Sequence, residues 1–264
     1  MTALAARVPA GRYGFRHVAR MEWIKLRSLR STWWTLVITV AGAIAIGVAV
    51  GINTRNGSGD LTNNALAGII PALVLTSVLG VLTMTNEYSS GMIRSTLAAA
   101  PSRPLLLAAK AAVFGAMALV VGEAASFISF FAGGAALSHG IAAPTLGEPG
   151  VLRAVLLSGA SFGLVGLIGL GLGAMVRHSA AACAAVVGAV YVAPAMIGGV
   201  SHSVARYLPI FIVGNSLSTT KPQSCAPAAA CVHSLSAWAG LGVIALYAVA
   251  ALAIGGWLFA RRDA

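Results

Sequence analysis

The sequence predicts an all-α integral membrane protein with six transmembrane helices, an N-terminal amphipathic helix at the membrane interface, and a short cytoplasmic helix between the second and third spans. Of the 264 residues, 58% are hydrophobic and 9% are charged, whereas soluble domains are about 25% charged. Apolar runs long enough to cross a bilayer recur along the chain, and most charges lie between them. We expect a cytoplasmic N-terminus at 1–32 and one membrane domain at 33–264.

The first expected element is an interfacial helix at 12–30. Its apolar face carries Phe15, Val18, Ala19, Leu26 and Leu29. The interfacial residues on the remaining surface are Arg16, Arg20, Trp23 and Arg27. Two residues break the pattern, since Glu22 falls on the apolar face and Ile24 on the basic one. A helix that lies on the membrane surface fits this pattern better than a nucleic-acid-binding arm does, so no nucleic-acid partner is expected.

Six apolar runs are the predicted spans: 33–52, 64–85, 105–137, 152–176, 180–200 and 237–260. Trp33 and Trp34 stand at the start of the first span, where aromatic rings favour the membrane interface. Pro71 lies inside the second span and is expected to kink it, because proline removes a backbone donor. Pro194 lies near the far end of the fifth span.

The distribution of basic residues sets the expected orientation. Of the 17 Lys and Arg residues, thirteen lie on the side of the two termini and four on the other side. Cytoplasmic flanks of membrane helices are enriched in these residues. We therefore expect a multi-pass protein of the cell membrane with both termini in the cytoplasm. The basic segment before the first span is longer than that of a cleavable signal peptide, and it also suits contact with anionic membrane lipid.

The segment 86–104 is a polar interruption between the second and third spans. Asn86 or Ser89 is expected to cap a short helix, and Pro101 to end it near Ala100. This leaves a helix of about three turns between two spans. Such a helix can transmit force into the membrane if a partner pushes on it. Lys110, early in the third span, is expected to extend its amine to the cytoplasmic interface.

No motif for chemistry stands out. A P-loop needs a Gly-Lys pair to hold phosphates, and none of the three lysines, Lys25, Lys110 and Lys221, follows a glycine. There is no HExxH motif and no zinc or haem spacing, and the acidic residues are scattered. We therefore expect no enzyme activity, metal or cofactor in this chain, and any nucleotide chemistry would belong to a partner.

Glu123 is the acidic residue deep within a span. A charge at mid-membrane costs about 2.5–3.5 kcal/mol on insertion scales, so such residues usually face a bundle interior or a wet cavity. Two interpretations remain open. Glu123 is either a polar point on a substrate path or subunit interface, or a buried protonated acid that bonds a neighbouring helix.

Paired glycines and cysteines complete the polar and small-residue features. Three pairs have the GxxxG spacing that lets helices approach closely: Gly47 with Gly51, Gly159 with Gly163, and Gly169 with Gly173. The first pair also suits a dimer seam. Cys225 and Cys231 lie in an outer loop, where their spacing is compatible with a small disulfide ring, and Cys183 is expected to be a packing residue.

The segment Glu87–Leu97, with the sequence EYSSGMIRSTL, carries a family likeness. Together with Pro101-Ser102-Arg103 and Lys110, it resembles the first cytoplasmic loop of ABC-2 type transporter permeases. Those proteins commonly show a Glu, a Gly four residues later, a basic residue, Thr-Leu, and a Pro-x-Arg before the next span. The basic N-terminal helix, the six spans and the longer outer segment before the last span extend the resemblance over essentially the whole chain.

The resemblance implies the membrane subunit of an ABC exporter. Two permease subunits, identical or different, would pair, and a separate ATPase subunit would bind ATP and Mg²⁺. The interfacial helix and the first loop would contact that ATPase, with the loop as coupling helix. The residues assigned to this coupling are Glu87, Gly91, Met92, Ile93, Arg94, Thr96 and Leu97. The spans suit an amphipathic or hydrophobic cargo.

Two other functions compete with this one. A non-transporting membrane scaffold or sensor would use the same cytoplasmic surface for docking. A secondary transporter fits less well, because that class often shows inverted repeats and several intramembrane charges. No clear internal repeat is present, and Glu123 is the one charge at depth.

Overall fold

The computed structural model describes residues 14–55, 59–137, 141–200, 202–219 and 235–261, and these residues form helices and connecting turns with no strand among them. The helices are α1 (Phe15–Ser28), α2 (Arg30–Asn53), α3 (Leu61–Ala65), α4 (Ile69–Ser89), α5 (Met92–Ala99), α6 (Arg103–Ala135), α7 (Val151–Val176), α8 (Ser179–Val187), η1 (Gly188–Val192), α9 (Ala193–Val200), α10 (His202–Ala205), α11 (Pro209–Leu217) and α12 (Ala237–Arg261).

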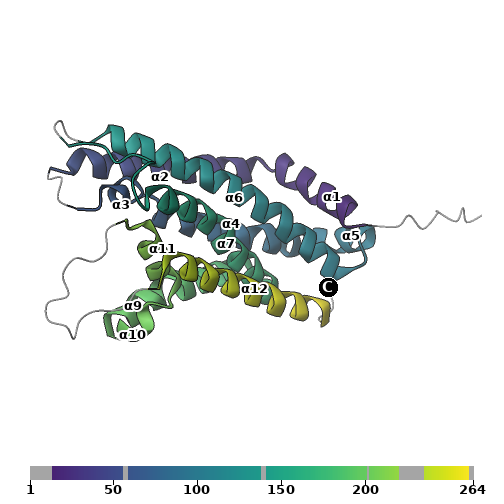
Figure 1. The fold of residues 1–264 in the computed structure, drawn as a ribbon. Helices are drawn as coiled ribbons and strands as arrows, with labels where there is room; N and C mark the ends of the chain where they lie inside the picture. The colour runs from purple at the N-terminus through teal and green to yellow at the C-terminus, as the bar shows by residue number, and fades with distance from the viewer. Residues whose placement is uncertain (1–13, 56–58, 138–140, 201, 220–234, 262–264) are drawn as a thin grey trace, which may run out of the picture.

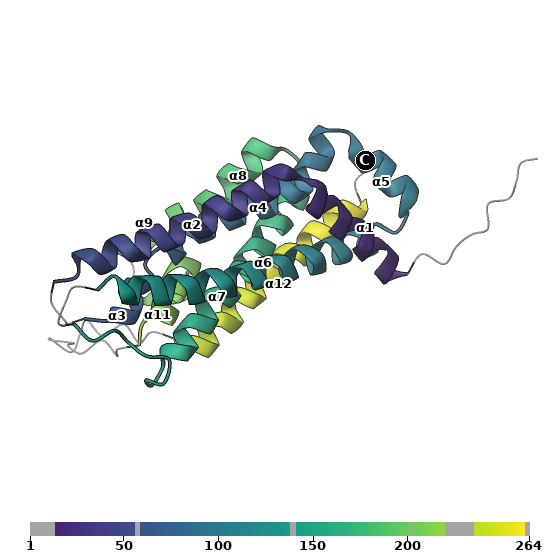
Figure 2. The same ribbon diagram turned by 90° about the horizontal axis from the view of Figure 1, so that it is seen from above.

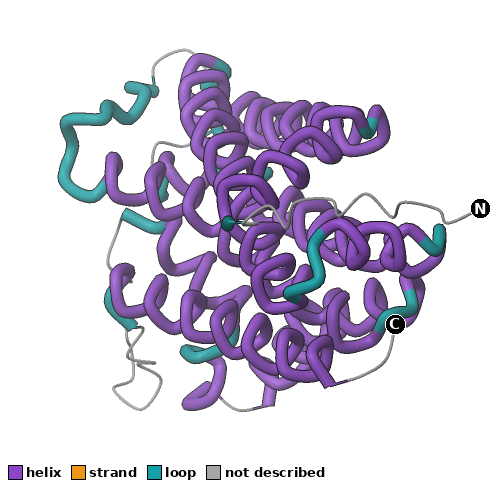
Figure 3. Tube along the Cα trace, turned by 90° about the vertical axis from the view of Figure 1, so that its right-hand side faces the viewer, coloured by secondary structure: helices purple, strands orange, loops and turns teal. Residues whose placement is uncertain are grey.

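Six helical segments of the described chain are long and apolar enough to cross a membrane. They are α2, α4, α6, α7, the segment Ser179–Ile197 and α12. The predicted all-α class and the six spans are therefore confirmed, and the chain is a multi-pass membrane protein by length and composition. The long helices run along one bundle, with α1, α5 and the end of α12 at one end and α3, α9 and α10 at the other (Figure 1). Figure 3 views this bundle from the end that carries α1 and α5.

Helix α7 lies in the middle of the bundle and packs against α4, α6 and α12. Glycines make this close packing possible. A Cβ atom at Gly169 would collide with the carbonyl oxygen of Ser77, and one at Gly173 would lie 2.9 Å from the carbonyl oxygen of Val81. The backbones of α4 and α7 therefore touch almost directly, as the GxxxG spacing predicts.

The glycine pair in α2 faces the inside of this chain. A Cβ at Gly47 would lie 2.5 Å from the carbonyl oxygen of Ala65, and one at Gly51 would lie 2.6 Å from that of Gly133. The pair seats α2 against α3 and α6. The interpretation of these glycines as a dimer seam is therefore wrong, because their free sides are already covered.

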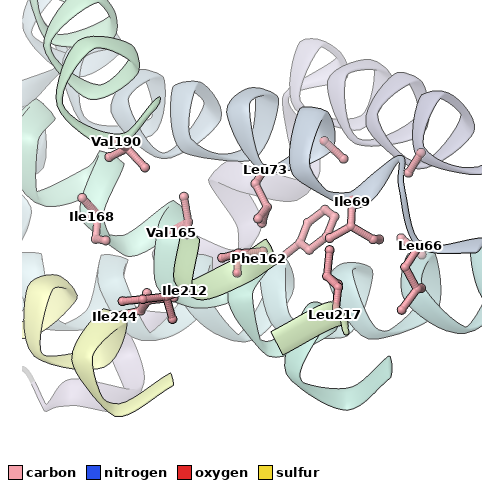
Figure 4. Close-up of a cluster of buried hydrophobic side chains, with 14 of the residues drawn as sticks. Leu66, Ile69, Leu73, Phe162, Val165, Ile168, Val190, Ile212, Leu217 and Ile244 are labelled. Atoms are coloured by element: carbon pink, nitrogen blue, oxygen red, sulfur yellow. The ribbon is translucent and has the colours of Figure 1, made fainter. Parts of the chain in front are cut away.

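A cluster of buried aliphatic and aromatic side chains joins the helices near the α3 and α11 end. Figure 4 shows this cluster, in which the labelled side chains are Leu66, Ile69, Leu73, Phe162, Val165, Ile168, Val190, Ile212, Leu217 and Ile244. They come from α4, α7, η1, α11 and α12 and the turn before α4. The short helix α11 thereby becomes part of the bundle core.

The second span begins and ends later than expected. The short helix α3 occupies the start of the predicted run, and α4 begins only at Ile69. Pro71 thus falls in the first turn of α4, where the backbone N–H has no intrahelical partner to lose, so the physical reason for the expected kink does not apply. At its other end α4 continues through Glu87 to Ser89. The predicted caps Asn86 and Ser89 are therefore helical, and the prediction of caps there is wrong.

The fifth span contains a π-helical stretch at η1, directly before Pro194. Proline has no N–H to donate to the carbonyl four residues earlier, here Val190, and its ring crowds that carbonyl. A local widening of the helix accommodates the proline without ending the helix. The span accordingly continues into α9.

At the α3 end, Asp60 joins two loops. Its carboxylate accepts hydrogen bonds from the backbone N–H of Asn63 at 3.1 Å, from the Ser218 hydroxyl at 2.9 Å, and from both the N–H and the hydroxyl of Thr219. Arg153 Nη2 donates to the carbonyl oxygen of Ser218 at 3.0 Å. These bonds tie the residues that follow α11 to α3 and α7.

Of the cysteines, only Cys183 lies among the described residues, where it is half-buried with a free thiol against the core, consistent with a packing role. Cys225 and Cys231 lie outside the described residues, so their expected pairing stays a prediction.

Candidate functional site

Two acidic side chains from distant parts of the chain are buried at the α1 and α5 end. Glu22 projects from α1 and is 1% exposed. Glu87 projects from the last turn of α4 and is 6% exposed. Buried carboxylates are stable only when they are paired or hydrogen-bonded. Their partners therefore decide how this end of the protein is held together.

Two lysines pair with both acids. Lys110 Nζ lies 2.6 Å from Glu22 Oε2 and 2.7 Å from Glu87 Oε1. Lys25 Nζ lies 3.1 Å from Glu22 Oε1, 3.0 Å from Glu87 Oε1 and 3.0 Å from the Thr96 hydroxyl. We call these five residues the ion-pair cluster. It is neutral overall, and it bonds α1, α4, α5 and α6 to one another.

The local sequence explains why α1 buries an acid. Val18, Glu22 and Leu26 are spaced by one helical turn each and form the buried face of α1. Val18 and Leu26 pack against the apolar cluster formed by the ends of α4 and α6, which brings Glu22 to Lys110. The acid that broke the amphipathic pattern is therefore the residue that fixes this helix to the bundle.

Lys110 is 4% exposed and points into the bundle. Its amine lies at the α1 and α5 end, where the sequence placed it, but it is bound by two buried carboxylates and is not exposed there. An ammonium ion is expensive to bury without such partners. The position of Lys110, one turn after Leu106 on α6, places it level with Glu87.

The short helix α5 is two turns long, shorter than the expected three. Gly91 precedes it with φ 71°, a left-handed conformation that glycine adopts without strain, and this turns the chain sharply after α4. Pro101 follows its end, as expected. The helix therefore lies at the end of the bundle as a separate element (Figure 2).

The residues assigned to coupling divide into two groups. Glu87, Ile93 and Thr96 are buried inside the chain, where Ile93 packs on the apolar cluster and Thr96 joins the ion-pair cluster. Exposed on α5 or at its start are Gly91, Met92 and Arg94, and Leu97 is half-buried. The buried group positions α5, and the exposed group forms its outer surface. Direct contact of Glu87 with a partner, as first expected, does not fit its burial here.

The interfacial residues of α1 all lie on its outer surface. Arg16, Arg20, Trp23 and Arg27 are exposed, with Trp23 at 44%. The helix is shorter than expected at its end, because the chain leaves helical geometry at Leu29. Trp33 Nε1 donates to the carbonyl oxygen of Arg27 at 3.1 Å and fixes the corner between α1 and α2.

Two further contacts attach α7 and α12 to this end. The Arg177 guanidinium lies 5.1 Å from the centre of the Tyr88 ring, which joins the turn after α7 to α4. Arg103 Nη1 donates to the carbonyl oxygen of Phe259 at 3.1 Å and joins α6 to α12. These contacts connect this end of the protein to α7 and α12 as well as to α4 and α6.

Glu123 lies apart from the ion-pair cluster, on α6. Its carboxyl group faces Gly159 of α7, and a Cβ atom at that glycine would collide with it. Its Oε2 atom is buried and has no hydrogen-bond partner within the described residues. Gly159 thus leaves room for the acid as well as bringing two helices together. Both interpretations of Glu123 stay open.

Nothing in the part of the chain that the structure describes forms a cluster of three His, Cys, Asp or Glu side chains fit to hold a metal ion. The contacts of the ion-pair cluster join four helices, α1, α4, α5 and α6.

Sequence reasoning picked Glu87 and Thr96 but missed that Glu22, Lys25 and Lys110 belong with them. Two signals pointed to this. Glu22 stood on an apolar face, and Lys110 stood within an apolar run. An acid on an apolar face and a base within an apolar run are candidates for each other.

Compared with models of known protein families and with curated protein sequences, the chain matches none.

Proposed function

We propose that this chain is the transmembrane permease subunit of an ABC-2 type ATP-binding cassette transporter, exporting an amphipathic or hydrophobic substrate across the cell membrane. A separate ATPase subunit would bind ATP and Mg²⁺ and hydrolyse the nucleotide. A second permease subunit, identical or related, would complete the transporter. Both termini and α5 would then lie in the cytoplasm, as the distribution of Lys and Arg favours.

The ion-pair cluster carries this proposal. A transporter driven from outside the membrane needs a surface element that is rigidly attached to its spans, since rigid elements transmit a movement that flexible loops absorb. Helix α5 meets this need, because Thr96 bonds Lys25, which in turn bonds Glu87 at the end of α4. Lys110 extends the connection to α6.

The outer surface of α5 suits a docking partner. Met92 is 45% exposed, and it stands beside the exposed Arg94 and Ser95. An exposed apolar side chain beside a guanidinium is the composition found at protein interfaces. On α1, at the same end, Arg16 and Arg20 add positive charge. We infer that an acidic or mixed surface of the ATPase docks here.

A copurification experiment tests the proposal. The full chain is purified from its native membranes, and the complex is examined for an ATP-binding subunit and for ATPase activity. Arg94→Glu should weaken the association and lower the activity, because it reverses the charge at the centre of the docking surface. Arg55→Glu is the matched control, since Arg55 is also exposed but lies at the opposite end of the bundle, and it should leave both unchanged.

The proposal fails if no ATPase associates, or if the ATPase activity of the complex is insensitive to Arg94→Glu. A partner that binds the α5 surface without ATPase activity would favour the membrane scaffold or sensor instead. Transport of a cargo by reconstituted vesicles would then be absent as well.

A further inference from the structure

A cleft of about 390 Å³ opens beside the ion-pair cluster, between the junction of α1 with α2, the second half of α4, and the start of α5. It shares Met92 with the outer surface of α5. Its wall on α4 runs from Leu79 through Leu82 and Thr83 to Asn86. These seven residue steps correspond to about 10 Å along the helix axis.

The polarity of the cleft changes along this length. Leu79 and Leu82 form the wall on the membrane side, whereas Asn86 and Ser90 line the end next to α5. An apolar wall that leads into a polar end at the level where a span leaves the membrane matches an amphiphile, with a tail at one end and a headgroup at the other.

Several hydroxyl groups that line the cleft already donate to backbone carbonyl oxygens. Ser28 donates to the carbonyl oxygen of Lys25 at 2.9 Å, Thr35 to that of Ser31 at 2.9 Å, and Ser90 to that of Asn86 at 2.6 Å. Each hydroxyl oxygen keeps acceptor capacity. Glu87, also in the lining, keeps its buried Oε2 atom without a hydrogen-bond partner among the described residues. The lining therefore offers acceptors to the hydrogen-bond donors of a ligand.

The charged groups of the lining do not favour an anion inside the cleft. Lys25 has three protons, and its amine lies within hydrogen-bond distance of Glu22, Glu87 and Thr96. No proton is left for an anion, and the ion-pair cluster is neutral. The exposed residues Arg27 and Arg30 flank lining residues Ser28 and Leu29 along the chain. Neither arginine is among the lining residues, so positive charge for the phosphate of a ligand would come from outside the lining.

From these observations we propose that the cleft binds a membrane lipid with a phosphoethanolamine headgroup. The ammonium group donates to the acceptors of the lining, among them Glu87 Oε2, and the phosphate lies toward Arg27 and Arg30. An acyl chain follows Leu79 and Leu82. This inference does not depend on the proposed transport function, since a scaffold with the same cleft would bind the same lipid.

The experiment compares two short-chain lipids that differ only in the headgroup amine. The full chain is purified in detergent and delipidated, and binding of dioctanoyl-phosphatidylethanolamine and dioctanoyl-phosphatidylcholine is measured by native mass spectrometry. The choline headgroup has no N–H donor. We expect the ethanolamine lipid to bind about tenfold more tightly, a ratio that corresponds to about 1.4 kcal/mol. Phosphoethanolamine without chains should bind far more weakly, which separates a lipid from a free headgroup.

Ser89 and Ser90 provide a matched pair of variants. Both hydroxyls donate to the carbonyl oxygen of Asn86, at 3.2 and 2.6 Å, but only Ser90 lines the cleft. The double variant Asn86→Leu/Ser90→Ala should lose the preference for ethanolamine, while Ser89→Ala keeps it. Ser31→Phe, at an exposed lining position, should fill the cleft and abolish lipid binding. Unfolding midpoints close to that of the unmodified chain show that each variant is folded.

Equal binding of the two lipids would overturn the proposal. So would a preference that survives in the double variant, because the headgroup would then lie elsewhere. Tighter binding of dioctanoyl-phosphatidylglycerol than of the ethanolamine lipid would overturn it too, since it would reveal a site for net negative charge.

Discussion

Removing Lys110 is the sharpest test of the ion-pair cluster. In Lys110→Met the side chain keeps much of its length but loses its charge. Two contacts disappear, at 2.6 Å to Glu22 and 2.7 Å to Glu87. Both carboxylates are almost fully buried, with side-chain exposures of 2% and 8%, so water cannot replace the lost ammonium group.

The expected loss of stability follows from this burial. Two carboxylates would face the single ammonium group of Lys25, which leaves one buried negative charge uncompensated. Breaking a buried pair by removing one partner costs about 3–5 kcal/mol. Lys25→Met should cost less, about 1–3 kcal/mol, because the Lys25 side chain is 22% exposed and water can reach this side of the cluster.

The assay is reversible unfolding in mixed detergent micelles. It is applied to the single variants Lys110→Met, Lys25→Met and Glu22→Gln, and to the double variant Glu22→Gln/Lys110→Met, which is compared with its two component single variants. The double variant removes one charge of each sign and restores neutrality. Its loss should therefore be about 0.5–3 kcal/mol smaller than the sum of the two single losses. Strictly additive losses, or a Lys110→Met variant as stable as the unmodified chain, would refute the view that these charges interact in a buried site.

Three further predictions concern other parts of the bundle. Gly169→Ala should cost about 1–3 kcal/mol in unfolding experiments, since its Cβ meets the α4 backbone, whereas Gly42→Ala, with open space around it, should be neutral or stabilising. A small effect at Gly169 would mean that α4 and α7 separate easily. Asp60→Asn should speed hydrogen exchange of the Thr219 amide, whose N–H donates a hydrogen bond to the Asp60 carboxylate, and unchanged exchange would contradict the connection between these loops. Glu123→Gln should leave stability within about 0.5 kcal/mol, because Oε2 has no partner among described residues; in reconstituted vesicles, unchanged transport would remove the functional interpretation of this acid.

Much of the fold could be predicted because membrane helices are encoded locally. A span must satisfy its own backbone hydrogen bonds in lipid, so a long apolar run is sufficient to identify it. Errors arose at helix ends, where neighbouring elements decide. The residues after Asn53 gave no clear sign that a separate α3 would delay the second span to Ile69, which also moved Pro71 into a first turn where it does no damage.

The candidate site was predicted only in outline. The sequence singled out the segment at 86–104 and the basic helix before the first span, and it gave each a surface role. It assigned Glu87 and Ile93 to that surface as well, yet both are buried. Which side of a two-turn helix faces inward depends on the angle at which the chain leaves Gly91, and local sequence does not fix that angle.

By itself, the sequence determined the membrane class, the six spans and the glycine contacts that let α7 lie at the centre, because each depends on composition or on spacing within one helix. Only the tertiary structure decided that Glu22, Lys25, Glu87 and Lys110 meet. These charges are up to 88 positions apart, and each alone would be a costly residue in an apolar setting. Packing of α1 against α4 and α6 brings them within hydrogen-bond distance, and the mutual attraction in a buried site makes their burial stable.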